Sequence, residues 1–321
     1  MTNLSGDHHF TFVHYRFTLR PQGPLAMPAF GKGTTLRGGF GTAFRRLVCI
    51  DLRLDCATCE LRYTCPYTKV FNPFVPLEAG RLTKNQNIPR PFVIKAPLEA
   101  KTQYLPGESL SFDFVVVGEA IDYLPYFVVA WRELTENGFG LNRARCTLST
   151  ITSLNLRGEE QIVYDGREGT VHPPSEYLNW QTLATRTVEV SGVREITLRF
   201  LTPTTLKSEG EVVAVPQFHQ LIKRLRDRVN ALASFYCGGA LDLDFKALGQ
   251  QAEAVQTVRV NSQWVDRTRR TRRGFAQDLS GFIGEVTYRG DLRPFLPLLL
   301  LGEYVHVGKN AAFGNGWYRL G

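Results

Sequence analysis

With 321 residues, the chain is long enough to form two ordinary domains, each with its own hydrophobic core. Its content of hydrophobic residues, 43%, and of charged residues, 21%, is that of a globular protein and excludes an intrinsically disordered one. The net charge of +8 mildly favours an anionic partner.

No segment of the sequence is typical of secretion or of membrane insertion. The first ten residues, MTNLSGDHHF, lack the apolar run of a signal peptide. The most apolar stretch, residues 295–301, is too short to cross a bilayer and contains a proline. We therefore expect a soluble, cytoplasmic protein with no membrane partner.

The chain begins with a predicted strand and a predicted helix. Residues 10–20 alternate between apolar and polar side chains, as a half-buried strand does. Residues 35–49 follow a helical period, and their apolar side chains share one face: Leu36, Phe40, Ala43, Phe44 and Leu47. Gly38, Gly39 and Gly41 each weaken this helix by about 1 kcal/mol, so they predict a close approach by another element or by a ligand.

Four of the six cysteines follow within one short segment, at Cys49, Cys56, Cys59 and Cys65. In a cytosolic chain, a Cys-x2-Cys pair with two more thiols nearby is more often a metal site than a disulfide framework. Four thiolates complete the tetrahedral coordination of zinc, so we expect a structural zinc ion. An iron–sulfur cluster and free thiols are the alternatives. The other two cysteines are expected to be packing residues.

After a proline-rich stretch, the pattern predicts a strand, a helix and another strand. The strands are predicted at residues 109–118 and 143–154, and the helix at 122–138, where it ends at an Asn-Gly pair. Residues 155–193 are polar and contain turn signals, which indicates a linker or an edge hairpin.

The second half repeats this order. Its predicted elements are a strand at 195–207, a helix at 216–236, strands at 256–265 and 281–290, an apolar helix at 293–308 and a short strand at 317–320. The first of these helices is amphipathic, with four apolar residues on one face: Leu221, Leu225, Val229 and Leu232.

The repeated order predicts an α+β protein with two tandem ferredoxin-like domains, each with the βαββαβ order of RNA-recognition motifs. We place these domains at residues 1–192 and 193–321. The first contains the cysteine-rich segment as an insertion and ends in the polar linker hairpin. A sheet of this kind presents one open face to single-stranded RNA.

The densest positive charge follows the predicted strand at 256–265. Five arginines fall within seven positions: Arg267, Arg269, Arg270, Arg272 and Arg273. Arginine binds phosphate with two hydrogen bonds and stacks on bases, and such a run repels itself unless an anion is bound. We therefore expect these arginines to bind RNA, with a solvated loop as the alternative.

A glycine-rich loop, GKNAAFGNG, occupies residues 308–316. Its spacing does not match a P-loop, and the chain after it is too short for the helix of a dinucleotide-binding fingerprint. It is therefore either a tight turn or a surface that a polyanion backbone can approach closely.

Four motifs point to one family. They are LRGGFGTAFRRLVC (36–49), CPYTKVFNP (65–73), LTPTTLK (201–207) and, above all, LLLLGEYVHVGKNAAFGNGWYRL (298–320). They resemble the CRISPR-associated pre-crRNA-processing endoribonucleases of the RAMP superfamily. The resemblance implies that the glycine-rich loop follows the RNA backbone in a groove between two ferredoxin-like domains. It also implies a metal-independent cut in each CRISPR repeat, in which a 2′-hydroxyl attacks the adjacent phosphate and leaves a 2′,3′-cyclic phosphate and a 5′-hydroxyl.

Such a cut needs a base, an acid and cations that stabilise the charge on the phosphorane. Many members of this family have a histidine in or near the first helix, but this sequence has none between His14 and His172. His306 and Lys309, beside the glycine-rich loop, are the first candidates for catalysis, and Lys32, Arg37 and Tyr304 are secondary ones. A packing role is the alternative for His306, which alternates with two valines.

The resemblance further implies contacts with RNA and a set of partners. Besides the arginine run, the candidate RNA-binding residues are Arg37, Gly308, Gly314, Asn315 and Gly316. The expected partners are CRISPR repeat RNA or crRNA and subunits of a CRISPR effector complex. The alternative is a non-catalytic RAMP subunit that binds crRNA within such a ribonucleoprotein, which the missing histidine favours.

Overall fold

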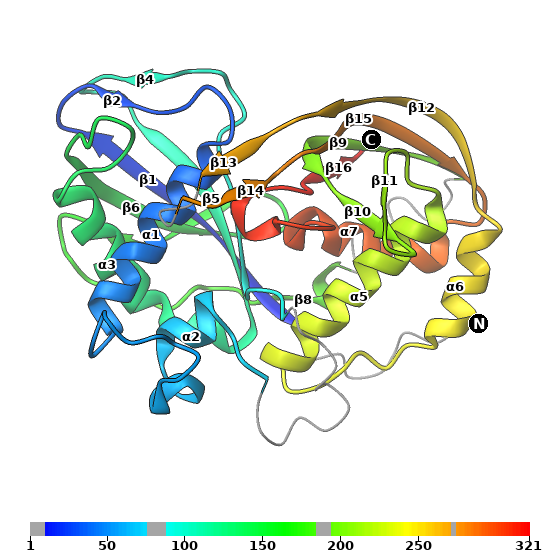
Figure 1. Cartoon of the computed structure of the whole chain (residues 1–321), viewed down its shortest axis with the longest axis horizontal. Coiled ribbons are helices and arrows are strands. Elements are labelled where there is room, and N and C mark those ends of the chain that lie inside the picture. Colours follow the sequence, from blue (N-terminus) through cyan, green and yellow to red (C-terminus); the bar gives the residue numbers. More distant parts are fainter. Residues whose placement is uncertain (1–9, 76–87, 184–193, 271–273) are drawn as a thin grey trace. The chain divides into compact units, whose positions relative to one another are not determined.

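The computed structural model describes residues 10–75, 88–183, 194–270 and 274–321 (Figure 1). The chain divides into two compact units, which we describe separately. The N-terminal unit contains Thr11–Leu178 and Phe235–Cys237, and the C-terminal unit contains Asn179–Ser234 and Gly238–Gly321. The predicted domain boundary at 192–193 lies outside the described residues and stays a prediction.

The N-terminal unit is built on one antiparallel sheet. Its elements are β1 (Thr11–Pro21), β2 (Leu25–Ala26), α1 (Lys32–Val48), η1 (Glu60–Tyr63), α2 (Pro66–Phe71), β3 (Phe92–Lys95), β4 (Gln103–Tyr104), β5 (Leu110–Val117), η3 (Gly118–Tyr123), α3 (Leu124–Glu136), β6 (Cys146–Leu154), β7 (Glu160–Asp165) and β8 (Leu178–Asn179). The described strands pair in the order β3-β5-β1-β6-β7, and β8 also pairs with β1. The path β1-α1-β3-β5-α3-β6 therefore has the ferredoxin-like order, with the first strand between the third and the fourth.

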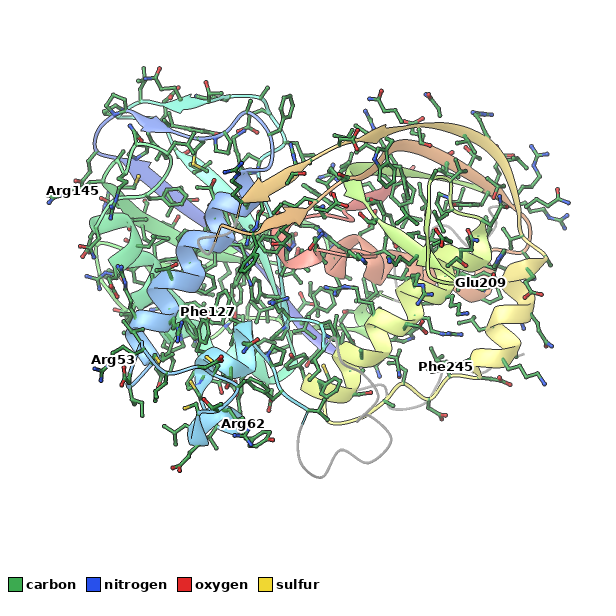
Figure 2. The ribbon with its side chains drawn as sticks, in the orientation of Figure 1. Arg53, Arg62, Phe127, Arg145, Glu209 and Phe245 are labelled. Carbon is green, nitrogen blue, oxygen red and sulfur yellow. The ribbon has the colours of Figure 1, made fainter. Side chains whose placement is uncertain are left out.

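Helices α1 and α3 pack side by side on one face of this sheet (Figure 1). Aromatic rings fill the layer beneath them: Phe40 of α1 stacks on Trp131 of α3 at 5.4 Å, and Phe17 of β1 lies 6.0 Å from Trp131. Figure 2 shows Phe127 within this unit, whereas Arg53 on the cysteine-rich segment points outward. Burial of these rings is the main source of stability for the unit.

The predicted buried face of α1 is confirmed at four of its five positions, Leu36, Phe40, Ala43 and Phe44. Leu47 is instead 37% exposed, because it lies in the last turn before the helix ends. A Cβ atom would lie 3.0 Å from Leu134 if added at Gly39 and 2.9 Å from Phe71 if added at Gly41, whereas Gly38 has open space around it. The predicted close approach is confirmed at these two glycines, and it is made by the protein itself.

The opposite face of the sheet carries a network of charged side chains. His14 Nε2 lies 2.9 Å from Asp113 Oδ2, and Arg16 Nε donates to Asp113 Oδ1 at 2.8 Å. Arg16 also donates to Glu160 at 2.6 Å, which links β1 to the edge strand β7. Burial alone would raise the pKa of Asp113, but the hydrogen bonds from His14 and Arg16 outweigh it and lower this pKa to about 2.

The C-terminal unit repeats the same order with a smaller sheet. Its elements are β9 (Glu195–Thr204), β10 (Leu206–Ser208), β11 (Glu211–Val213), α5 (Phe218–Tyr236), α6 (Phe245–Glu253), β12 (Gln256–Val265), β13 (Thr268–Arg270), β14 (Ala276–Asp278), β15 (Gly281–Arg289), η4 (Arg293–Phe295), α7 (Leu296–Val305), η5 (Ala311–Phe313) and β16 (Tyr318–Leu320). The described strands pair in the order β12-β15-β9-β16. The path β9-α5-β12-β15-α7-β16 is again ferredoxin-like, so the structure is an α+β protein with two antiparallel-sheet domains.

The amphipathic helix α5 packs as predicted, because its four apolar residues are at most 1% exposed: Leu221, Leu225, Val229 and Leu232. Arg228 on this helix donates to the backbone oxygen of Val305 at 2.8 Å, which ties α5 to the end of α7. Among the described residues, no helix is long and apolar enough to cross a membrane.

Two helices of the structure differ from the sequence prediction, whereas the predicted edge hairpin is confirmed. Helix α7 stops at Val305, shorter than predicted, because His306 has a left-handed φ of 62°. Helix α6 was not predicted; its N-cap is Asp244, whose carboxylate accepts hydrogen bonds from the backbone N–H groups of Lys246 and Ala247. Within residues 155–183, β7 pairs along β6, which confirms an edge hairpin there.

Candidate functional site

The glycine-rich loop connects α7 to β16 and needs glycine for conformational reasons. Gly308, Gly314 and Gly316 have φ of 80°, 90° and 75°, values that other residues rarely adopt. A Cβ atom on Gly316 would collide with the carbonyl group of Val307, and one on Gly308 with that of Thr205. The close approach at this loop is therefore made by the protein's own backbone, while the approach of an RNA backbone stays a prediction.

The loop is held against the end of β9 by main-chain hydrogen bonds. Lys309 N donates to the oxygen of Thr205 at 3.1 Å, and Gly316 N donates to that of Pro203 at 3.1 Å. The Thr202 hydroxyl donates to the Gly314 oxygen at 2.8 Å. The motif at residues 201–207 thus supports the glycine-rich loop directly.

His306 lies beneath this loop and is fully buried. Its ring stacks on Trp317, with centroids 5.9 Å apart and planes 5° from parallel. Its Nδ1 lies 3.0 Å from the backbone oxygen of Asn315, so Nδ1 carries the proton that this bond requires. The Asn315 side chain is also buried and donates to the oxygen of Leu279 at 3.0 Å. Both predicted site residues therefore make contacts that shape the loop from inside.

Lys309 is the exposed cation of the loop. It lies close enough to Asp278 to help lower the pKa of that carboxyl, although hydrogen bonds from Ser280 are the larger cause. Because its backbone is fixed at Thr205 while its side chain is in solvent, Lys309 can reach a bound anion without any rearrangement of the loop.

The hairpin of β13 and β14 continues β12 and β15 and contacts the glycine-rich loop (Figure 1). We call this the hairpin–loop contact; it is made by Arg269, Gln277, Asn310 and Phe313. Arg269 Nε donates to Gln277 Oε1 at 2.9 Å, and Gln277 Nε2 donates to Asn310 Oδ1 at 3.1 Å. The Arg269 guanidinium also lies 4.4 Å from the centroid of the Phe313 ring. Two features that lie about 40 positions apart in the sequence are thus joined in one site.

The described arginines of the run differ in their surroundings. Arg269 is half-buried in the hairpin–loop contact, whereas Arg270 is exposed on the other face of the hairpin. Arg267 is half-buried, and burial lowers its pKa. Arg272 and Arg273 lie outside the described residues. Among the described arginines of this run, Arg270 has the guanidinium most accessible to a polyanion.

The remaining predicted site residues belong to the N-terminal unit. Arg37 of α1 is half-buried, with its guanidinium 5.5 Å from the centroid of the Phe71 ring. Phosphate contact by Arg37 therefore stays a prediction.

The cysteine-rich segment holds its four cysteines without a disulfide. Cys49, Cys56, Cys59 and Cys65 are all half-buried and form no disulfide. In the part of the chain that the structure describes, which includes all four, no three His, Cys, Asp or Glu side chains converge as metal ligands. The segment is instead held by Arg45, whose Nη2 donates to the backbone oxygens of two leucines at 3.3 and 2.9 Å. The predicted zinc ion and the alternative iron–sulfur cluster therefore stay predictions.

Comparison with known proteins agrees with this architecture. The family model AF_1859_N, an N-terminal domain, matches residues 10–176, and the model of the CRISPR-associated endoribonuclease Cas6 matches residues 198–318. An uncharacterized protein from Archaeoglobus fulgidus is 27% identical over 90% of this chain and 91% of its own length.

Solved structures share the fold along nearly the whole chain. The structure of a Cas6 product complex has a TM-score of 0.56 at 18% identity, and the match covers 96% of this chain and 99% of that chain. The structure of Thermus thermophilus Cas6 has a TM-score of 0.52 at 17% identity, and the match covers 97% of this chain and 98% of that chain. The structure of a partial complex of Cas6-RT-Cas1 with Cas2 has a TM-score of 0.57 at 14% identity, and the match covers 97% of this chain and 46% of that chain. The chain therefore belongs to the AF_1859_N family through its N-terminal domain, and its C-terminal residues 198–318 match the family model of the CRISPR-associated endoribonuclease Cas6.

Proposed function

We propose that this protein cleaves the repeats of precursor CRISPR RNA at the glycine-rich loop. The 2′-hydroxyl of the substrate attacks the adjacent phosphate, which leaves a 2′,3′-cyclic phosphate and a 5′-hydroxyl. The match of residues 198–318 to the Cas6 model supports RNA cleavage, and a similar Cas6 structure is a product complex. The single observation that carries the proposal is the hairpin–loop contact, which fixes an arginine-rich hairpin beside a loop with an exposed lysine.

The surroundings of Lys309 and His306 support different roles for these two residues in the proposed reaction. Charge develops on the phosphate oxygens in the transition state, and a fixed cation beside them lowers the barrier. Lys309 fits this role because it is exposed and its backbone is anchored. His306 is suited to hold the loop in shape through Asn315 and Trp317, since its buried ring faces no solvent. A catalytic His306 would require the RNA to displace this packing.

A cleavage assay with CRISPR repeat RNA in EDTA tests the proposal. The RNA is also prepared with one 2′-deoxy substitution at each candidate position. We expect one discrete cut that persists in EDTA and disappears with a single deoxy substitution, because only the attacking 2′-hydroxyl is indispensable. A cut that requires a divalent metal, or that survives every deoxy substitution, would refute the mechanism.

A non-catalytic RAMP subunit that holds crRNA is the second candidate. It is favoured by the absence of histidine from α1 and by the burial of His306. Tight and specific binding of repeat RNA without any cut would support it over the enzyme.

A further inference from the structure

Two arginines lie directly opposite each other on the exposed face of the C-terminal sheet. Arg199 of β9 pairs in register with Arg319 of the neighbouring strand β16 (Figure 1). Residues that are paired in this way point to the same face, and both side chains are exposed, that of Arg199 by 68%. We call them the arginine pair. Like charges directly opposite each other destabilise a sheet, so the arginine pair is a candidate site for an anion.

The carboxylates of this face do not neutralise the arginine pair. Glu195 accepts two hydrogen bonds from Arg289, at 2.9 and 2.7 Å. Glu285 lies opposite Arg199, but its Oε1 is 3.7 Å from Arg199 Nε, beyond hydrogen-bonding distance. Arg319 forms no ion pair with a carboxylate of the described residues. Two guanidinium groups therefore share one loosely held carboxylate.

The arginine pair adjoins the glycine-rich loop through Trp317. The Arg319 guanidinium lies 5.6 Å from the centroid of the Trp317 ring. The same ring stacks on His306 beneath the loop, and Trp317 directly follows Gly316 in the chain. The backbone of Trp317 is fixed, because its N–H group donates to the Thr202 hydroxyl at 2.9 Å. An RNA strand bound at the loop can therefore continue to the arginine pair within the same unit.

We propose that Arg199 and Arg319 bind one backbone phosphate of the RNA strand that leaves the glycine-rich loop. The proposal rests on the proposed function and extends it from the cleavage site to the exposed face of the C-terminal sheet. Residues directly opposite each other on antiparallel strands have Cα atoms about 5 Å apart, so two guanidinium groups can reach the same phosphate. Each guanidinium can form two parallel hydrogen bonds with the phosphate oxygens.

The surroundings of the arginine pair favour RNA over an acidic protein segment. Protein interfaces are built around an apolar core, whereas Thr197, Glu285 and Thr287, next to the pair on this face, are polar. Every linkage of RNA carries a negative charge, so a strand held at the glycine-rich loop brings further phosphates to neighbouring cations. No additional partner is then needed to supply the anion.

The salt dependence of binding tests the contact with phosphate. Repeat RNA is blocked by a 2′-deoxy substitution at the cleavage position. We expect Arg199→Ala and Arg319→Ala each to weaken binding about 10-fold and to lower the slope of log affinity against log salt by about one. The control Arg293→Ala removes a side chain that is also 68% exposed but bonded to Asp291, and it should change neither quantity. Equal effects of all three variants would overturn the proposal, because they would reflect net charge alone.

Glu285 provides a variant with the opposite expected effect. Its carboxylate competes with a bound phosphate for Arg199. Glu285→Gln should therefore strengthen the binding of the same blocked RNA. An affinity no higher than that of the wild type would count against a phosphate at Arg199.

A double-mutant cycle between protein and RNA identifies the phosphate. Single linkages outside the cleavage position are replaced, one at a time, by an uncharged methylphosphonate. One replacement should weaken binding to the wild type about as much as the double variant Arg199→Ala/Arg319→Ala does. The same replacement should cost the double variant almost nothing more. If no replacement couples to the arginine substitutions, the proposal is overturned.

The outcomes for the two proposals can be told apart. If the protein cuts repeat RNA as proposed but no linkage couples, only the arginine-pair proposal fails. If it binds without cutting and one linkage couples, the arginine-pair proposal stands and the catalytic one fails. If it does not bind repeat RNA at all, both are overturned.

Discussion

Replacing Arg269 with alanine is expected to weaken the binding of repeat RNA without changing its salt dependence. The guanidinium donates a hydrogen bond to Gln277, worth about 1 kcal/mol, and lies over the Phe313 ring in a cation–π contact worth about 1 kcal/mol at a partly buried site. Losing both removes about 2 kcal/mol from the hairpin–loop contact. If RNA needs hairpin and loop in this arrangement, affinity falls by up to about 30-fold.

The assay is a titration of repeat RNA at several salt concentrations, with Arg270→Ala as the matched control. Arg270 is exposed, so its loss should lower the slope of log affinity against log salt by about one. Arg269→Ala should leave that slope unchanged, because its guanidinium is bound within the protein. A slope that falls equally for both variants would show that Arg269 contacts phosphate, and an unchanged affinity would show that the hairpin–loop contact plays no part in binding.

Three more predictions concern the loop and the charged network. Gly316→Ala should lower the melting temperature of the C-terminal unit, because alanine at φ 75° is strained and its Cβ collides with the backbone. Gly249→Ala, a control inside α6 with open space around it, should not lower the melting temperature. Equal melting temperatures for the two variants would contradict this prediction. Lys309→Ala should slow cleavage about 100-fold with little change in affinity for the RNA. Lys207→Ala, which removes an exposed lysine on β10, should not slow cleavage. Equal cleavage rates of the two variants in single-turnover assays would refute the role of Lys309. Asp113 has a folded pKa of about 2, below its usual 3.8, so the roughly 2 kcal/mol that it contributes is present above pH 4 and is lost as the pH falls toward 2. The free energies of unfolding of the wild type and of Asp113→Asn should therefore converge as the pH falls from 4 to 2. A difference between these free energies that persists at pH 2 would contradict the prediction.

The sequence predicted the repeated fold well because its signal is periodic and local. The alternation in β1 and the apolar face of α5 each depend on residues a few positions apart, and both are confirmed. Helix α6 was missed although Asp244 offered a capping signal, because its nine residues are fewer than the roughly 11 to 18 over which a helical period is recognised.

The candidate site was only partly predictable because it depends on contacts distant in sequence. Charge density marked Arg269 and Arg270 as equivalent, but the register of the hairpin turns one toward Phe313 and the other toward solvent. His306 alternates with two valines like a strand residue, yet its left-handed backbone ends α7 and buries its ring against Trp317. Neither fact follows from residue type and spacing.

The chemistry of the RNA ends tests the central claim most directly. Purified protein and CRISPR repeat RNA are incubated in EDTA, and the two fragments are analysed by mass spectrometry. We expect a 2′,3′-cyclic phosphate on the upstream fragment and a 5′-hydroxyl on the downstream one, since the attacking group is the substrate's own 2′-hydroxyl. A 5′-phosphate with a 3′-hydroxyl, or intact RNA recovered in a tight complex, would contradict the account.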